Sequence, residues 1–142
     1  MGDNMKEIKI GDKASFTKKI SSEDIHTYAE VSGDDNPVHI DEEYAEKSIF
    51  GERIAHGYHV GSFISAAIGK HLPGNGSIYL TQSMQFKAPV KINDIITATV
   101  EIVDFPKEKH VLLKTVCTNQ HDKEVITGEA LIIPPPDTIL IR

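Results

Sequence analysis

A single helix pattern followed only by strand patterns is the feature that most constrains the fold of this chain. The segment 57–71 carries apolar residues at the i, i+3, i+4, i+7 and i+8 spacing of one helix face. These residues are Val60, Phe63, Ile64, Ala67 and Ile68. The opposite face consists mostly of glycine, serine and alanine, so this helix has little charge to present to water, and Pro73 and Gly74 end it. We therefore predict a long, buried central helix.

The segments on either side of this helix predict a sheet. Downstream, apolar and polar residues alternate in four segments, as expected for strands with one buried face. These segments cover 78–86, 96–102, 111–117 and 126–132, and Pro134, Pro135 and Pro136 end the last one. Upstream, we predict a strand over 13–20 and a short helix that starts at Ser21 and Asp24 and runs to about Val31. The order predicts one α+β domain, residues 1–142, in which an antiparallel sheet wraps around one long central helix.

Composition and charge limit the partners and the compartment. The 15 Lys and Arg residues against 21 Asp and Glu give a net charge of −6, which argues against nucleic acid or an anionic membrane as a partner. The longest weakly polar stretch, 60–69, is shorter than the roughly 18 residues that span a bilayer. The single cysteine, Cys117, cannot form a disulfide within the chain, so we expect a cytoplasmic protein. Because the predicted sheet has open edges, we expect a homodimer.

The segment 32–56 is dense in turn-forming residues, with a helical turn or two only at 42–47, and loops this long in a small domain are usually functional. It contains Asp34 and His39, which lie five positions apart across an Asn36-Pro37 turn. Residues at this spacing diverge on a helix and lie on opposite faces of a strand, so only a bent loop aims both at one point. A carboxylate and an imidazole that converge can hold and polarise one water molecule.

The same residues also fit less specific roles. A turn of this composition can be an inert surface turn, in which an Asp–His pair only stabilises the loop. His56 and His59 lie at i, i+3 spacing, but they make a poor zinc site without a third ligand nearby. We therefore predict no metal.

Several motifs occur in order along the chain. They are Tyr28-Ala29-x-x-Ser32-Gly33-Asp34-x-Asn36-Pro37-Val38-His39, then Phe50-Gly51-Glu52-Arg53-Ile54-Ala55-His56-Gly57, then segments at 72–80 and 86–90. Together they resemble the MaoC-like, (R)-specific enoyl-CoA hydratases over nearly the whole chain. The resemblance implies a hot-dog fold, an acyl-CoA thioester as substrate, and reversible hydration of trans-2-enoyl-CoA to (R)-3-hydroxyacyl-CoA. It implies no cofactor.

The resemblance also implies roles for individual residues. Asp34 and His39 are expected to activate water, and the backbone N–H of Gly57 is expected to stabilise the thioester oxyanion. Ser65 matches a serine that lines the family's active site, and we assign Asn36 to substrate binding with it. Gly57 also opens the predicted helix, where its N–H is unpaired at the positive end of the helix dipole. Ser65 fits equally well as a small residue that lets the helix pack closely.

Two other functions stay open. A non-catalytic module that binds acyl thioesters would keep the hot-dog pocket, although damage to the acid–imidazole pair would mark such a module and here the pair is intact. A hot-dog acyl-CoA thioesterase would release free CoA in place of adding water to the double bond. Neither the acyl chain length nor the choice between CoA and an acyl carrier protein follows from the sequence.

Overall fold

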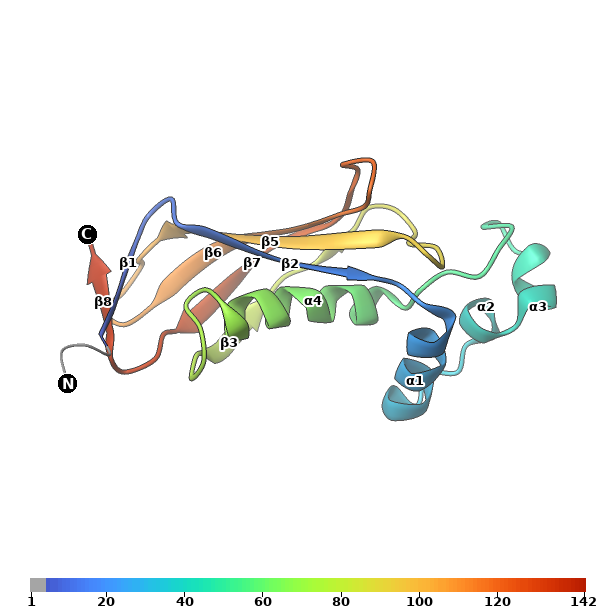
Figure 1. Cartoon of the computed structure of the whole chain (residues 1–142), viewed down its shortest axis with the longest axis horizontal. Coiled ribbons are helices and arrows are strands. Elements are labelled where there is room, and N and C mark those ends of the chain that lie inside the picture. Colours follow the sequence, from blue (N-terminus) through green and yellow to red (C-terminus); the bar gives the residue numbers. More distant parts are fainter. Residues whose placement is uncertain (1–4) are drawn as a thin grey trace.

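The chain folds as a curved antiparallel sheet that wraps around one long helix (Figure 1). The computed structural model describes residues 5–142, so residues 1–4 of the predicted domain lie outside the described residues. The helices are α1 (Ser22–Ser32), α2 (Pro37–Ile40), α3 (Glu42–Glu46) and α4 (Gly57–Lys70). The strands are β1 (Lys6–Lys9), β2 (Lys13–Lys19), β3 (Ile78–Gln82), β4 (Gln85–Phe86), β5 (Ile95–Asp104), β6 (Val111–Thr118), β7 (Glu124–Ile133) and β8 (Thr138–Ile141).

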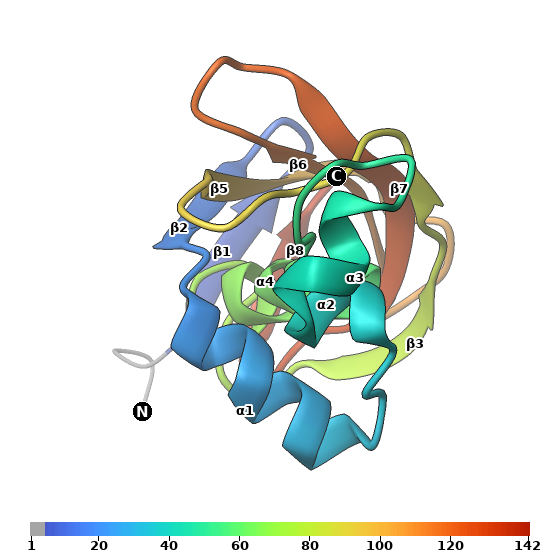
Figure 2. The same ribbon diagram turned by 90° about the vertical axis from the view of Figure 1, so that its right-hand side faces the viewer.

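The main sheet contains six strands in the order β2-β5-β6-β7-β3, with β4 also paired to β7. Every pairing in this sheet is antiparallel. The alternation predicted for the third long strand segment is present in β6, where Val111, Leu113 and Cys117 are fully buried. Figure 2 shows the sheet curving around α4. This is the hot-dog arrangement that the sequence resemblance implied.

The helix α4 packs one face against the concave side of the sheet. Its buried residues include the five apolar positions that the helical spacing predicts: Val60, Phe63, Ile64, Ala67 and Ile68. The opposite face is less buried than the predicted central, buried helix implies, because Ser62 and Ser65 are exposed and Tyr58 is 66% exposed. Among the described residues, no helix has the length and apolar character needed to cross a membrane.

The three N-terminal helices lie beyond the end of the sheet where α4 begins (Figure 1). The predicted start of α1 is confirmed, because the Ser21 hydroxyl accepts a hydrogen bond from the Asp24 N–H at 3.0 Å. The expectation of a bent loop at 37–40 needs correction, since this segment forms the helical turn α2. The Asn36 side chain caps it by accepting from the Val38 N–H at 3.3 Å, and Pro37 occupies the first helical position, where its missing N–H costs nothing.

Three features of the strands differ from the predictions. The strand predicted over 78–86 is divided into β3 and β4, because Ser83 leaves the regular ladder and bonds through its N–H and its hydroxyl to the backbone of Glu129. The last predicted strand ends before the prolines as expected, but the chain then forms β8. This strand pairs in parallel with β1, which the sequence pattern also missed. Strands of four residues offer too few positions to show a period.

Gly128 in β7 permits the break between β3 and β4, because a Cβ built there would overlap the carbonyl oxygen of Ser83. A backbone oxygen cannot rotate away as a side chain can. We expect Gly128→Ala to lower the free energy of unfolding by about 3 kcal/mol, because the strand break must separate from β7. Urea unfolding measures the change.

Gly69→Ala is the matched control for this prediction. Gly69 lies in α4, and a Cβ there would meet no atom within 4 Å. Because glycine is disfavoured inside helices, we expect the free energy of unfolding of this variant to be unchanged or to rise by about 0.5–1 kcal/mol. It should therefore unfold at the same or a slightly higher urea concentration. Equal destabilisation of both variants would contradict a specific clash at Gly128.

Candidate active site

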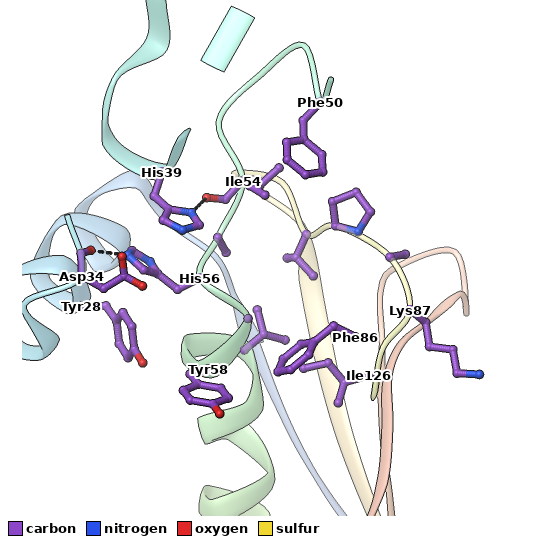
Figure 3. Close-up of a pocket in the computed structure, with 16 residues that line it drawn as sticks. Tyr28, Asp34, His39, Phe50, Ile54, His56, Tyr58, Phe86, Lys87 and Ile126 are labelled. Atoms are coloured by element: carbon purple, nitrogen blue, oxygen red, sulfur yellow. Dashed lines mark hydrogen bonds between the residues drawn. The ribbon is translucent and has the colours of Figure 1, made fainter. Parts of the chain in front are cut away.

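A cavity of about 610 Å³ opens where the loops of the N-terminal helices meet the start of α4 (Figure 3). The polar side chains that line it are Tyr28, Asp34, His39, His56, Tyr58 and Lys87. The other lining residues are Phe50, Ile54, Ala55, Gly57, Val60, Phe86, Ala88, Pro89, Val90 and Ile126. An apolar cleft of this size with a few convergent polar groups is typical of a small-molecule site.

The structure brings Asp34 and His39 together in this cavity. A carboxylate oxygen of Asp34 and a ring nitrogen of His39 lie within 4.8 Å of each other. One water molecule with hydrogen bonds of ~2.8 Å can bridge two atoms at this separation. The His39 Nδ1 lies 2.7 Å from the Ile54 carbonyl oxygen, and a carbonyl oxygen only accepts, so Nδ1 carries the hydrogen. The lone pair is therefore on Nε2, which makes His39 a competent base.

The chain around Asp34 turns sharply because each residue has a local reason to bend. Gly33 ends α1 in the left-handed conformation, with φ of 80°. The Asp34 N–H donates to the Ser32 hydroxyl at 3.1 Å, and the Asp34 carboxylate accepts from the Asn36 N–H at 3.3 Å. Asn36 itself is exposed and does not line the cavity. Its observed role is to cap α2, so its predicted contact with substrate has no support within one chain.

Gly57 and Ser65, both on α4, lie in different surroundings. Gly57 lines the cavity as the first helical residue, so its N–H has no carbonyl one turn earlier in the helix to bond with. A Cβ on Gly57 would lie 2.6 Å from the Phe86 ring, so glycine keeps this wall of the cavity close to the backbone. Ser65 is exposed more than two turns along the helix and is not among the lining residues.

Comparison with known proteins identifies the family. Residues 5–125 match the family model described as MaoC like domain. The chain belongs to the MaoC-like domain family. It is 48% identical to the (R)-specific enoyl-CoA hydratase of Rhodospirillum rubrum, over 91% of this chain and 90% of that protein. It is 41% identical to a mitochondrial 3-hydroxyacyl-(acyl-carrier-protein) dehydratase of Arabidopsis thaliana, over 90% of this chain and 78% of that protein.

A solved structure supports the same assignment. The unliganded R-hydratase PhaJ1 from Pseudomonas aeruginosa superposes with a TM-score of 0.87 and is 44% identical, covering 90% of this chain and 83% of that chain. These matches confirm the expected family, the hot-dog fold and the enzyme class, a hydratase of the hydro-lyase type.

Two residues that surround Asp34 and His39 in this MaoC-like site were not predicted from the sequence to do so. Arg53 is only 8% exposed, and its Nε donates to the His39 carbonyl at 2.6 Å. Its other nitrogens reach the Ser22 hydroxyl at 3.0 Å and the His26 Nε2 at 3.3 Å, so Arg53 ties α1 to α2 behind His39. His56 is 2% exposed and lies beside both Asp34 and His39. Both residues occur in the second motif, but only the folded structure shows what they contact.

Asp34, His39 and His56 also form a group that offers three possible metal ligands within 4.8 Å. The His56 Nε2 lies 2.8 Å from the Asp34 carbonyl oxygen and must carry a hydrogen there, so only the His56 Nδ1 is left to coordinate a metal. The prediction of no metal therefore stays a prediction, and no step below uses one.

The surroundings of His39 predict how the activity depends on pH. Burial lowers the pKa of His39 and the neighbouring His56 lowers it further, against opposite effects of the Ile54 carbonyl and the Asp34 carboxylate. The net pKa lies below the ordinary value of about 6.5. If His39 acts as the base, it must be neutral, so activity would be lost as the pH falls through this lowered pKa. We expect the acid limb of kcat/KM below pH ~6.5, measured in a series of buffers, and a limb above that value would contradict this assignment.

Proposed function

We propose that this chain is an (R)-specific enoyl-CoA hydratase that reversibly converts trans-2-enoyl-CoA to (R)-3-hydroxyacyl-CoA. The observation that carries the proposal is the convergence of the Asp34 carboxylate and the His39 ring in an apolar cavity at the N-terminus of α4. The name of the Rhodospirillum rubrum relative supports the same activity. The proposed activity needs no cofactor.

In the proposed mechanism, Asp34 and His39 hold one water molecule between them. As the water oxygen attacks C3 of the enoyl group, His39 Nε2 accepts its proton, and the electron pair of the double bond moves onto the thioester oxygen. The Gly57 N–H stabilises this enolate oxygen at the positive end of α4. His39 then gives the proton to C2, which completes the addition, so hydration consumes one water molecule and returns Asp34 and His39 to their starting protonation states. Positioned acid–base groups typically contribute about 10²–10⁴ in rate.

The apolar wall of the cavity gives the acyl chain a place to lie. Val60, Val90 and Ile126 supply side chains that are almost completely buried. Lys87 lines the same cavity but extends away from the Asp34–His39 pair (Figure 3). We propose CoA as the handle, since the enoyl-CoA hydratase relative is the more similar of the two relatives described above.

We further propose that residues 1–142 act as one domain and that two copies form a homodimer through β3 and the exposed face of α4. The strand β3 is an edge strand, paired only on its β7 side, and Ile78 and Leu80 are 55% and 43% exposed. Ser65 lies on the exposed helix face, so its proposed contact with substrate would require the second copy. We also propose a cytoplasmic location, because the single cysteine, Cys117, cannot form a disulfide within the chain and its thiol is buried, with its pKa raised to about 12 by that burial.

The activity is tested with crotonyl-CoA. We expect loss of the enoyl absorbance without release of free CoA, and chiral chromatography should identify the hydrolysed product as (R)-3-hydroxybutyrate. Release of free CoA, detected with a thiol reagent, would indicate the thioesterase alternative. Binding of crotonyl-CoA without either reaction would indicate the non-catalytic module. Either of these two results would refute the hydratase proposal.

The dimer is tested by a charge on its proposed edge. Leu80→Lys places an ammonium group on β3, where pairing with a second copy would bury it, so we expect light scattering to show a monomer. Ile95→Lys is the matched control, because Ile95 is 45% exposed at the start of β5, which β6 and β7 separate from β3 in the sheet. A wild-type monomer, or a dimer that survives Leu80→Lys, would contradict this interface.

A further inference from the structure

His56 contacts each of the groups on which the proposed reaction depends. Its ring stacks on the His39 ring, with centroids 3.8 Å apart and an interplanar angle of 26°. Its Nε2 lies 2.8 Å from the backbone carbonyl oxygen of Asp34. It is also the N-cap residue of α4 and directly precedes Gly57 in the chain. Figure 3 shows its ring beside Asp34 and below His39.

We propose that His56 is a positioning residue of the hydration reaction. Its Nε2–H anchors the Asp34 peptide, and its ring fixes the plane of the His39 imidazole, so that carboxylate and base stay aimed at the same water molecule. The inference rests on the proposed function, because His56 is proposed to act only by positioning Asp34 and His39 for the hydration reaction.

The anchoring matters because Asp34 sits in an exposed loop. Two other hydrogen bonds hold Asp34, at 3.1 and 3.3 Å, and both join it to residues two positions away in the chain, Ser32 at the end of α1 and Asn36. The bond from His56 is shorter and connects the loop to the rigid end of α4. A displacement of about 1 Å in a reacting group can lower the rate about 10²-fold. Loss of the hydrogen bond from His56 should therefore lower kcat measurably.

The contacts also fix the tautomer of His56. A carbonyl oxygen only accepts, so the hydrogen is on Nε2 and the lone pair is on Nδ1. The Nδ1 is buried and has no hydrogen-bond partner among the described residues. The ring is held on its other side by Tyr28 of α1, whose centroid lies 4.7 Å away. The titratable groups around His56 are therefore Tyr28, Asp34, His39 and His59.

His59 offers a matched control one helical turn along α4. It is 7% exposed, has a buried Nδ1 without a partner among the described residues, and stacks on Tyr28 at 5.1 Å. It does not line the cavity. His59→Phe thus makes the same chemical change as His56→Phe, in a comparably buried place, without touching Asp34 or His39.

The experiment compares His56→Phe, His56→Gln and His59→Phe with crotonyl-CoA. Phenylalanine keeps a stacking ring but loses the donor, so we expect kcat to fall about 10–100-fold with KM changed less than about threefold. Glutamine restores an N–H near the Nε2 position, so kcat of His56→Gln should be at least about threefold higher than kcat of His56→Phe. His59→Phe should keep kcat within about threefold of the wild type. Thermal melting checks that each variant is folded.

Three outcomes would overturn the proposal. They are full kcat in His56→Phe, an equal loss in His59→Phe, and a His56→Gln variant no more active than His56→Phe. If the phenylalanine variant does not fold, the glutamine variant decides, since full loss there would rule out anchoring by the N–H.

A second measurement does not depend on turnover. Imidazole ¹⁵N spectra of the wild-type protein should show the His56 hydrogen on Nε2 and the His39 hydrogen on Nδ1, and a His56 hydrogen on Nδ1 would overturn the proposal. A wild-type protein without activity toward crotonyl-CoA would instead refute the proposed function, and these spectra would still decide whether His56 anchors Asp34.

Discussion

Replacing Asp34 with asparagine or His39 with glutamine is expected to lower kcat for hydration of crotonyl-CoA by about 10²–10⁴-fold. Both substitutions keep the size and most of the hydrogen bonding of the side chain. Each removes one ionisable group from the pair that lies within 4.8 Å across the cavity. Asparagine cannot carry the negative charge that orients and polarises the water, and glutamine cannot accept its proton. The measurement is the loss of enoyl absorbance at saturating substrate.

The neighbouring residues provide controls of the same chemistry. Asp35 is exposed and does not line the cavity, so Asp35→Asn removes one negative charge a single position away from Asp34. His121 is exposed in the turn between β6 and β7, so His121→Gln removes an imidazole far from the site. Both controls should keep kcat within about twofold. Wild-type turnover in either Asp34→Asn or His39→Gln would show that the pair is not the catalytic one.

The sequence predicted the parts of this fold that depend on local periodicity. The buried face of α4 and the long strands of the main sheet each repeat their pattern over enough residues to be recognised. The pairing of β1 with β8 was missed, since each strand has only four residues and their partners, such as residues 6 and 138, lie at opposite ends of the chain. The exposed face of α4 was missed because small side chains suit both close packing and an open surface.

The candidate site was likewise predictable only where it depends on local sequence. Turn chemistry around Asn36 and Pro37 indicated that Asp34 and His39 converge, and the structure places them so. The roles of Arg53 and His56 depend on contacts across 14 and 22 residues of chain, which no local pattern reports. Asn36 was assigned to substrate binding together with Ser65, but its side chain is engaged in capping α2.

Gly57→Pro is expected to lower kcat by about 10²–10³-fold relative to Gly57→Ala, because it removes the backbone N–H that we propose as the donor to the enolate oxygen. One such donor typically contributes about 2.7–4 kcal/mol to the transition state. The local geometry admits proline, since His56 has φ of −62° and ψ of 134°, the extended conformation that precedes proline. Gly57 is the first residue of α4, where proline is common because the N–H has no partner within the helix.

Gly57→Ala is the reference because it adds the same Cβ and keeps the N–H. In both variants the Phe86 ring must move, since a Cβ on Gly57 would lie 2.6 Å from it. Phe86 is 52% exposed, so its ring can turn toward solvent at a similar cost in each variant. The ratio of kcat between the two variants therefore reports the loss of the donor together with the proline Cδ that takes its place. A KM that agrees within about threefold would show that proline does not simply exclude the substrate, and melting temperatures within a few degrees would show that both variants are folded. Equal kcat values would place the oxyanion away from the N-terminus of α4 and would remove the electrostatic half of the proposed mechanism.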